Sequence, residues 1–436
     1  MSRAGQAAPP ETGDAQTAIV IGAGIVGVST ALWLQRAGHQ VTLVDREGPA
    51  AGASYGNAGV LASGSVIPVT TPGLLGRAPK MLLDPRQPLF LRWSYLPRLL
   101  PFLRRYLAHS NIGAVDRISE GLHLLLHDAY DQHAALAKGT PAEAYLTADD
   151  YIFGYAGKAG FEADRFAWDR RRALGVPFSE IDAAALAELE PDLKGCFGYA
   201  VRCPNHGRIT DPGAYVTALA GAFEAAGGHL KRAEIRDFEI TGERCTGVVT
   251  DAGTLRADTY ALTLGAWSGP LARRLGITVP LESERGYHIE FGNPSVHLKT
   301  TVMVASGKFV LNSMNGRLRC AGVLEFGGLD APASRAPFRL LRRQVADLFP
   351  RLTYGRIDEW MGHRPATADS LPVIGPSPRA KNVYLGYGHH HVGLTGGPKT
   401  GRWLARIMSG HAPNDNLAAF APDRQTWKNP GATERN

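Results

Sequence analysis

AIVIGAGIVG, residues 18–27, joins an apolar run to a cluster of glycines. Residues 28–38 continue as a helix-like segment that ends in glycine, and a second apolar run, residues 40–45, ends at Asp45. This order of strand, tight turn, helix, strand and acid is typical of the βαβ unit that binds a dinucleotide. The stretch therefore predicts a parallel, doubly wound sheet at the start of the chain.

The three glycines of this turn have separate physical roles. Gly22 permits the sharp turn, Gly24 lets the backbone approach a pyrophosphate, and Gly27 lets the helix pack closely against the sheet. The phosphates would lie at the helix N-terminus, where free N–H groups favour negative charge. Asp45 follows Gly22 by 23 positions (45 − 22). An acid at about this spacing hydrogen-bonds a ribose hydroxyl, which disfavours NADP.

Composition sets the broad class of the protein. A chain of 436 residues with 44% hydrophobic residues is long enough for two domains. Its four cysteines form no CxxC motif, which favours scattered thiols in a reducing, cytoplasmic compartment. The net charge of +7 fits an acidic substrate, an anionic cofactor or a membrane surface, and no nucleic-acid motif accompanies it. The chain has no apolar run of about 18 residues and no signal-like start, so no spanning helix is expected.

A small-residue loop with the sequence SYGNAG, residues 54–59, follows the βαβ unit. Together with the glycine turn, it resembles the second flavin-contacting segment of the FAD-dependent D-amino-acid oxidase superfamily. The closest resemblance is to the D-amino-acid dehydrogenase and glycine oxidase-like members. The resemblance implies that the dinucleotide is FAD, with Ser54 and Asn57 along the pyrophosphate and near the isoalloxazine ring.

The sequence Gly-His-Arg-Pro at residues 362–365 is a second point of resemblance. Alone, Arg364 would more often form a surface ion pair. In the family, the arginine of Gly-x-Arg-Pro binds the substrate carboxylate, and Arg364 falls on that position. A planar guanidinium suits this task because it grips a carboxylate through two parallel hydrogen bonds.

A third motif, GHHHVG at residues 388–393, matches the family's glycine- and histidine-rich turn except that His390 replaces a glycine. The resemblance implies that the helix after this turn points its N-terminus at the pyrimidine edge of the flavin. Consecutive residues of a strand point to opposite faces, so the three histidines make poor joint ligands and no metal is expected.

Other segments complete the expected cofactor site. Residues 257–268 resemble the family's strand that ends at the dinucleotide, and residues 229–235 are expected to form a strand beside the adenine. The residues expected to contact FAD are Gly22, Gly24, Ile25, Gly27, Asp45, Arg46, Ser54, Asn57, Ala58, Gly59, Ile235, Gly265, Ala266, Trp267, Arg364, Gly388, His391, Val392, Gly393, Leu394 and Thr395.

The substrate side departs from the resemblance at one position. Glycine oxidase-like enzymes often carry a tyrosine hydroxyl on the strand that here contains Phe309. We therefore predict Tyr287 or His288, in a form familiar from the D-amino-acid dehydrogenase group, as the missing donor. The expected catalytic residues are Arg364, Tyr287 and His288, and the expected substrate-binding residues are Arg364, Tyr287, Phe309 and His391.

The expected fold is α/β, with a Rossmann-like FAD-binding domain interleaved with an α+β substrate domain on an antiparallel sheet. The FAD-binding part is expected at 15–63, 207–275 and 355–412, and the substrate part at 64–206 and 276–354. One long amphipathic helix is expected over 114–137. Residues 1–14 and 413–436 are expected to be flexible tails.

Residues 74–106 alternate apolar residues with arginines, and two interpretations stay open. They form core-facing helices with solvated arginines, or a basic apolar surface that meets an anionic membrane or an electron-accepting partner. The second would place a cytoplasmic protein peripherally on the inner face of the membrane.

The expected reaction is the oxidative deamination of a small amino acid, a D-amino acid or cyclic imino acid, by hydride transfer from Cα to flavin N5. The product would be an imino or keto acid. The electron acceptor would be a quinone, an electron-transfer protein or oxygen, and a dehydrogenase is preferred over an oxidase. The alternatives are a membrane-docked, proline-type dehydrogenase feeding quinone, a sarcosine or glycine oxidase-type enzyme, and, on the first motif alone, an NAD enzyme.

The FAD is expected to be bound non-covalently. Residues 46–62 contain no histidine, and the only cysteine between Lys308 and the C-terminal motif is Cys320, on an expected strand.

Overall fold

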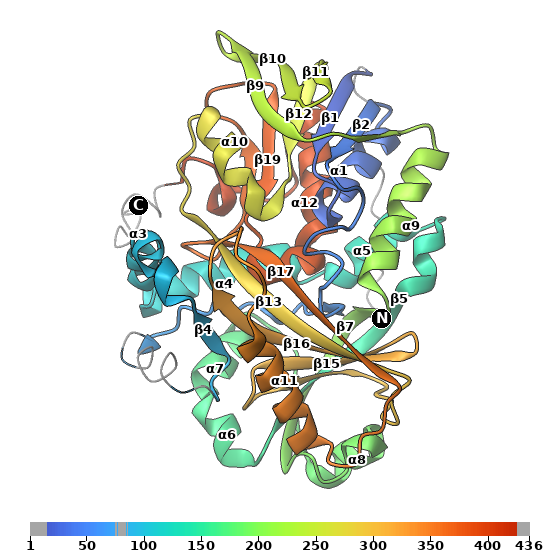
Figure 1. The fold of residues 1–436 in the computed structure, drawn as a ribbon, viewed down its shortest axis with the longest axis vertical. Coiled ribbons are helices and arrows are strands. Elements are labelled where there is room, and N and C mark those ends of the chain that lie inside the picture. Colours follow the sequence, from blue (N-terminus) through green and yellow to red (C-terminus); the bar gives the residue numbers. More distant parts are fainter. Residues whose placement is uncertain (1–14, 75, 77–83, 85, 425–436) are drawn as a thin grey trace.

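The computed structural model describes residues 15–74, 76, 84 and 86–424. Figure 1 shows a six-stranded sheet in the upper half of the molecule and a larger sheet in the lower half, with helices around both. The expected mixed α/β architecture is confirmed in this arrangement. The first βαβ unit belongs to the upper sheet, and the expected antiparallel strands belong to the lower one.

The six-stranded sheet has the order β18-β19-β12-β1-β2-β8. Strands β19, β12, β1, β2 and β8 pair in parallel, and β18 pairs antiparallel at the edge. Parallel strands covered on both faces are buried, which explains the continuous apolar runs in β1 and β12. The strands are β1 (Thr17–Ile21), β2 (Gln40–Asp45), β8 (His229–Arg232), β12 (Thr259–Leu262), β18 (Val373–Pro376) and β19 (Val383–Tyr387).

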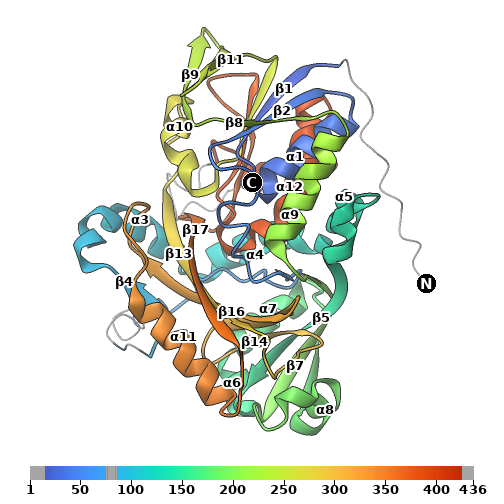
Figure 2. The same ribbon diagram turned by 45° about the vertical axis from the view of Figure 1, so that its right-hand side comes forward.

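The two faces of this sheet have different covers, as Figures 1 and 2 show. On one face α1 (Ile25–Arg36), α9 (Pro212–Ala225) and α12 (Gly393–Met408) share a core with the sheet. On the other lie α10 (Ser268–Arg274) and a small antiparallel sheet of β9 (Ile235–Thr241), β10 (Arg244–Thr250) and β11 (Gly253–Leu255). The strand expected at 229–235 is confirmed for residues 229–232 only, because β8 ends at Arg232 and the chain starts β9 at Ile235 in a different sheet.

The large sheet follows the order β17-β13-β16-β15-β14-β5-β7-β3, with β4 beside β16 and β6 beside β7. The helix α11 (Arg335–Leu348) covers its outer face. The strands are β3 (Val60–Leu61), β4 (Leu89–Leu91), β5 (Leu146–Tyr155), β6 (Ser179–Asp182), β7 (Tyr199–Ile209), β13 (Leu281–Gly292), β14 (Thr301–Val304), β15 (Phe309–Met314), β16 (Arg317–Phe326) and β17 (Arg356–Thr367).

The helix expected over 114–137 is two helices, α4 (Ile112–Leu126) and α5 (Ala129–Ala137). Lys399 of α12 lies at the break, where its Nζ donates to the carbonyl of Leu124 at 2.7 Å and to the carboxylate of Asp128 at 3.0 Å. These two bonds of the buried Lys399 stabilise the break between α4 and α5. The helix propensity of residues 114–137 does not reveal the break, because Lys399 is far away in the sequence. The other helices are α3 (Leu96–Ala108), α6 (Lys158–Ala163), α7 (Arg165–Ala173) and α8 (Ala183–Leu189).

Short 3₁₀ turns connect several of these elements. They are η1 (Trp93–Tyr95), η2 (Pro141–Tyr145), η3 (Pro191–Leu193), η4 (Gly265–Trp267), η5 (His390–Val392) and η6 (Ala418–Phe420).

The described part of the expected C-terminal tail is packed, so that part of the prediction is wrong. Phe420 is fully buried and its ring lies 5.6 Å from that of Trp403. Arg424 makes a two-pronged contact with the carboxylate of Asp369, at 2.8 and 2.9 Å. Residues 1–14 and 425–436, also expected to be flexible, lie outside the described residues.

The expected domain boundaries remain a prediction, but strand pairing bears on three of them. Strand β17 lies in the large sheet beside β13, although residues 355–367 were assigned to the FAD-binding part. Strands β3 and β7 pair with each other in the same sheet, across the boundaries expected at 63 and 207. The chain therefore passes between the sheets more often than motif order indicates.

Candidate active site

A cavity of about 1010 Å³ lies between the two sheets. Its lining runs from the turn after β1, along the 46–58 segment, to β13, β17 and the start of α12. The cavity thus joins the dinucleotide turn to Arg364, which are far apart in sequence. A volume of this size is at the upper end for ligand sites and suits an extended molecule such as a dinucleotide.

The glycine turn has the geometry that the motif predicts. Gly22 has a φ of +106°, which side chains rarely adopt. A Cβ at Gly27 would lie 1.7 Å from the carbonyl oxygen of Gly22. Only glycine therefore fits at position 27. This lets the first turn of α1 pack directly against the end of β1.

The polar groups around the start of α1 suit a pyrophosphate and a ribose. Gly24 is the N-cap of α1 and brings no side chain, and Gly24, Ile25 and Val26 at the start of the helix all line the cavity. The Ile25 N–H donates to Ser54 Oγ at 3.0 Å. Asp45 accepts from the Ala23 N–H at 2.9 Å and also lines the cavity. These residues fit the cofactor that the sequence predicts.

Replacing Gly24 with alanine is expected to weaken FAD binding about tenfold without unfolding the protein. The new Cβ would meet only Ser54 Oγ, at 3.4 Å, but it would stand where the pyrophosphate approaches. Fluorescence titration of apoprotein with FAD measures this. Gly221→Ala in α9, where a Cβ meets nothing within 4 Å, is the matched control. Unchanged FAD affinity in Gly24→Ala would place the pyrophosphate elsewhere.

Most residues predicted to contact FAD line the cavity. Gly27, Gly59 and Gly388 do not line it; each lies where neighbouring atoms leave no room for a Cβ. The predicted residues that line the cavity are Gly22, Gly24, Ile25, Asp45, Arg46, Ser54, Asn57, Ala58, Ile235, Gly265, Ala266, Trp267, Arg364, His391, Val392, Gly393, Leu394 and Thr395.

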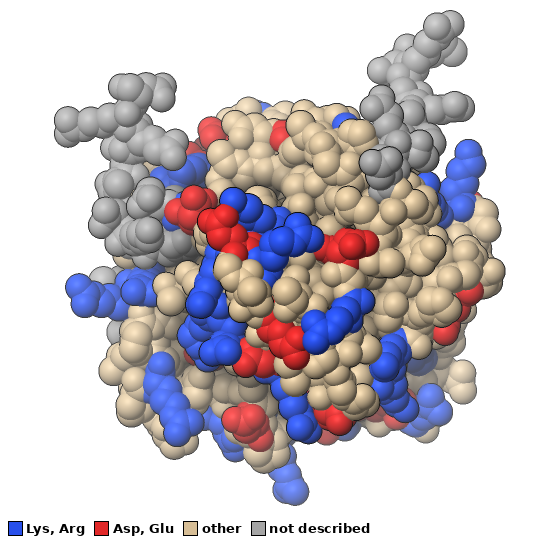
Figure 3. All heavy atoms as spheres, turned by 90° about the horizontal axis from the view of Figure 1, so that it is seen from above, with Lys and Arg blue, Asp and Glu red and all other residues tan. Residues whose placement is uncertain are grey.

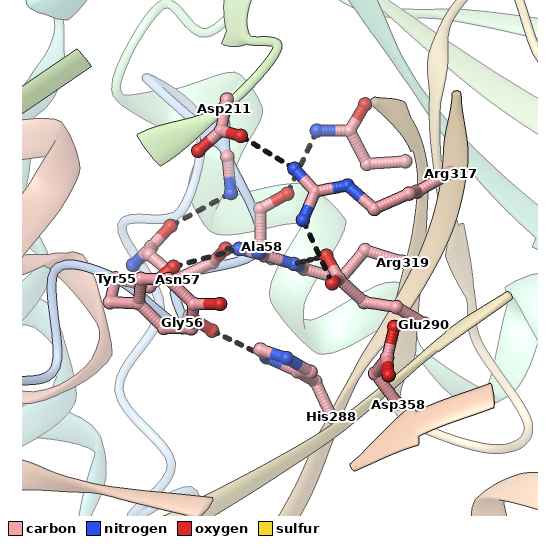
Figure 4. A network of polar contacts seen from close by, with 12 residues as sticks. Tyr55, Gly56, Asn57, Ala58, Asp211, His288, Glu290, Arg317, Arg319 and Asp358 are labelled. Carbon is pink, nitrogen blue, oxygen red and sulfur yellow. Dashed lines mark hydrogen bonds and ion pairs between the residues drawn. The ribbon is translucent and has the colours of Figure 1, made fainter. Parts of the chain in front are cut away.

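A buried network fixes the 54–59 loop to the large sheet (Figure 4). Arg319 of β16 donates to the carbonyls of Tyr55 at 3.0 Å and Asn57 at 2.5 Å, and its Nε donates to Glu290 at 2.7 Å. Arg317 joins Glu290 at 3.1 Å to Asp211 at 2.5 Å. The loop of the upper half is therefore held by charged side chains of the lower half.

His288 belongs to this network, which corrects its predicted catalytic role. Its Nδ1 lies 3.0 Å from the carbonyl oxygen of Gly56, and its ring stacks on Trp360 with centroids 5.0 Å apart. Burial, with help from Arg319, lowers the pKa of His288 to about 3. His288 is absent from the cavity lining, so its neutral ring positions the loop.

Tyr287 is among the residues that line the cavity, but its hydroxyl is already engaged in the outer core, which does not support the predicted donor role. The hydroxyl donates to Glu325 at 2.6 Å and accepts from the Ser334 N–H at 3.0 Å. The ring packs edge-on against Phe338 of α11. Burial and Glu325 together raise the pKa of Tyr287 to about 12. The side chain therefore lies in the core between the sheet and α11.

Tyr287→Phe is expected to lower the free energy of unfolding by about 1–3 kcal/mol, because it leaves a buried carboxylate and a buried N–H with one partner fewer. KM and kcat should stay within about twofold, since the hydroxyl that is removed bonds to Glu325 and Ser334 and not to a ligand. Thermal melting and steady-state kinetics check the two halves. A raised KM with unchanged melting would restore the substrate role.

Phe309 faces the same outer core, so its predicted place in the substrate site is wrong. It clusters with residues of β13 and α11, whereas the next residue, Val310, lines the cavity. Adjacent strand residues point to opposite faces, and the prediction was one residue out of register. Cys320 of β16 is likewise buried in this outer core.

Arg364 lines the cavity as predicted. It stands on β17 directly opposite Glu284 of β13, and its guanidinium lies across Gly286, where a Cβ would come within 2.7 Å of three of its atoms. Its side chain is 22% exposed, and Nη1 lies 3.8 Å from Glu284 Oε2, beyond hydrogen-bonding distance. Burial lowers the pKa of Arg364, and Glu284 opposes this.

The three histidines do not continue a strand, which corrects the stated reason against a metal. His390 begins the 3₁₀ turn η5 with a φ of +51°. His389 Nε2 lies 2.9 Å from Thr400 Oγ1, and His390 Nδ1 lies 2.8 Å from His391 Nδ1. Burial lowers the pKa of each histidine to about 3, so all three are neutral at neutral pH. Within the described part of the chain, no three histidine, cysteine or acidic side chains could hold a metal.

The sequence interpretation missed Glu284 and Tyr106, which line the cavity beside Arg364. For Glu284 a signal existed, because period-two alternation groups residues 284, 286 and 288 on one face. No local signal identified Tyr106. It projects from α3, inside the segment that was read as core or membrane surface.

Two sheets that enclose one cavity, with a dinucleotide turn at one end and a partly buried arginine at the other, form an arrangement that suits a dinucleotide-dependent oxidoreductase. Residues 17–407 match the DAO family, described as FAD dependent oxidoreductase. The chain belongs to this family, and it is an FAD-dependent amino-acid oxidoreductase. The predicted family, enzyme class and cofactor are thereby confirmed.

Similar proteins carry related names. A "D-amino-acid oxidase" of Bradyrhizobium diazoefficiens is 38% identical over 412 residues, which are 93% of this chain and 98% of that protein. A "D-amino acid dehydrogenase" of Allorhizobium ampelinum is 32% identical over 420 residues, 93% and 97% of the two chains. The structure of glycine oxidase from Geobacillus kaustophilus aligns with a TM-score of 0.70 at 22% identity, over 94% of this chain and 98% of that one. This last likeness supports the fold.

Proposed function

We propose that this enzyme oxidises a D-amino acid whose carboxylate is bound by Arg364, giving the imino acid. One observation carries the proposal: the partly buried guanidinium of Arg364 lines the cavity without a hydrogen-bonded carboxylate among the described residues. An arginine in this state is a ready site for a planar anion. Arg364 would also orient the α-carbon, since two parallel bonds fix the carboxylate plane.

When bound, FAD accepts the hydride that leaves the substrate α-carbon. The chain holds the two ends of the site. The α1 turn, Ser54 and Asp45 hold the pyrophosphate and ribose, and the N-terminus of α12 at Gly393 favours negative charge at the other end of the cavity. We expect non-covalent binding, so acid precipitation should release the flavin from the protein. Flavin that stays in the pellet would contradict this.

The D configuration is supported by the names of the relatives at 38% and 32% identity. A panel of D- and L-amino acids, sarcosine and proline tests it, with flavin bleaching under anaerobic conditions as the readout. We expect bleaching with D-amino acids. Bleaching by L-amino acids or proline alone would favour the alternative of a proline-type dehydrogenase.

The electron acceptor is proposed to be a membrane quinone or an electron-transfer protein that meets the α3 face. Leu99, Phe102 and Tyr106 of α3 are buried, but Leu100 is 54% exposed and Trp93 just before the helix is 59% exposed. Arg98, Arg104 and Arg105 are exposed on the same helix. α3 lies at the edge of the molecule (Figure 2). The proposal thus combines the two interpretations of residues 74–106, since α3 has both a core-facing side and a basic apolar surface. Residues 75, 77–83 and 85 lie outside the described residues.

Charge is mixed on the face seen in Figure 3, where lysines and arginines alternate with acidic residues over the described part. This face has no continuous basic patch of the kind that nucleic acid binds. Within the described residues, every helix is too short or too polar to cross a bilayer. Membrane contact through α3 would therefore be peripheral.

Vesicle sedimentation tests the α3 surface. Wild type should sediment with vesicles containing anionic lipid and remain free of neutral ones, and Leu100→Glu should lose the binding. Dye reduction that outpaces oxygen consumption would agree with a dehydrogenase. Rapid oxygen consumption, with no vesicle binding, would make the enzyme an oxidase.

A further inference from the structure

Three buried polar atoms on the cavity wall beside Arg364 lack a hydrogen-bond partner among the described residues. They are Tyr106 Oη, Glu284 Oε1 and His390 Nε2. Buried polar atoms are nearly always paired, and each unpaired one costs about 1–3 kcal/mol. Three such atoms on one wall of the cavity indicate a binding site for a polar ligand, which would supply the missing hydrogen bonds.

Glu284 is the charged member of this group. Its side chain is 2% exposed, Oε2 lies 3.8 Å from Arg364 Nη1 and 3.6 Å from His390 Nδ1, and none of these separations is a hydrogen bond. A buried carboxylate without hydrogen bonds is costly unless a cation joins it. Because Arg364 already faces a substrate carboxylate in the proposed function, Glu284 is free to meet a second, positive group.

The α-amino group of the substrate is the positive group that fits this position. In an amino acid the ammonium and carboxylate groups share one carbon, and here Glu284 and Arg364 are direct cross-strand neighbours. The cation of a long basic side chain would be several bonds further from the carboxylate. We propose that Glu284 binds the α-ammonium group of the substrate and removes one proton from it. This proposal rests on the function proposed for Arg364.

The proton transfer leaves the substrate ready for oxidation. One N–H bond of the ammonium breaks, its electron pair stays on nitrogen, and the proton forms an O–H bond at Glu284 Oε1. The freed electron pair on nitrogen can then form the C=N bond as the Cα–H bond breaks and its hydrogen leaves as hydride, for which bound FAD would be the acceptor. Tyr106 Oη and His390 Nε2, the other two unpaired atoms, would accept hydrogen bonds from the two remaining N–H groups.

The surroundings of Glu284 suit a proton acceptor. The titratable groups that face it are Arg364 on β17, His390 and His391 before α12, and Tyr106 on α3. Burial raises the pKa of Glu284, while Arg364 and His391 oppose the rise. The two histidines are neutral, so they do not compete with the ammonium as cations.

Glu284→Gln tests the proposal, because it keeps the shape and removes the base. At about pH 7 we expect kcat/KM for D-norleucine to fall about 100-fold or more. The kcat/KM of the variant should rise about tenfold per pH unit as the free amine becomes abundant, whereas the kcat/KM of wild type should not rise in this way. Hexanoate, which lacks only the amino group, should bind the variant as well as wild type, read from the flavin spectrum.

Glu282→Gln is the matched control, since Glu282 lies on the same strand, is held by Tyr95 at 3.1 Å and does not line the cavity. Glu282→Gln should leave kcat/KM for D-norleucine and the binding of hexanoate unchanged. If Glu284→Gln weakens the binding of ε-aminocaproate as much as that of D-norleucine, Glu284 binds a distal cation. That result would overturn the proposal. Unchanged kcat/KM in Glu284→Gln would also overturn it. If hexanoate binding is unchanged in Arg364→Lys, the proposed function itself fails.

Discussion

Replacing Arg364 with lysine is expected to lower kcat/KM for amino acids by two to three orders of magnitude, about 3–4 kcal/mol of transition-state stabilisation. Lysine keeps the positive charge but cannot form two parallel bonds to a carboxylate. The shorter reach of its ammonium across Gly286 would also change the angle at which the substrate lies. Both KM and kcat should therefore change, the first through lost binding and the second through lost orientation.

Steady-state kinetics with an amino acid and with the corresponding amine separate this role from a general disturbance. The amine has no carboxylate, so its poor turnover should be unaffected in Arg364→Lys. Arg356→Lys is the control on the same strand, because Arg356 is 70% exposed and pairs with Asp358 at the surface. Equal losses for the amino acid and the amine would refute carboxylate binding by Arg364.

Replacing Arg319 with methionine is expected to lower the free energy of unfolding by about 3 kcal/mol and to weaken FAD binding. The change removes a buried cation from Glu290 and leaves the carbonyls of Tyr55 and Asn57 without donors. Glu290 keeps Arg317, which limits the loss. The 54–59 loop would then lose its attachment to the large sheet (Figure 4).

Thermal melting of apoprotein and FAD titration measure the two effects of Arg319→Met. Arg342→Met is the control, because Arg342 forms an ion pair of 3.0 Å with Glu359 at the exposed surface. Such a pair contributes less than about 1 kcal/mol. If both variants melt alike and bind FAD alike, the buried network does not hold the loop.

The sequence could predict the dinucleotide end of the site because that end is built from contiguous residues. Gly22, Gly24 and Asp45 belong to one βαβ unit, whose spacing follows from strand and helix geometry. The position of Arg364 in the cavity was also predictable, but through a resemblance and not through physics. Its strand pairing with Glu284 depends on a contact across 80 residues (364 − 284).

The errors at the substrate end have one cause. Alternation along a strand groups residues by face but does not say which face meets the cavity. The Tyr287 hydroxyl and the Phe309 ring were therefore expected in the cavity, although both lie in the outer core, and Glu284 was overlooked. Tyr106 had no signal of any kind, since α3 reaches the cavity only through long-range packing against residues such as Phe326.

Anaerobic mixing of the holoenzyme with D-amino acids tests the central claim most directly. The structure and the proposed role of Arg364 predict that the visible absorbance of the flavin is bleached rapidly by a D-amino acid, only slowly by its decarboxylated amine, and not at all by its desamino carboxylate. Flavin that stays oxidised with every amino acid, or that is reduced equally by the amine, would contradict the assignment.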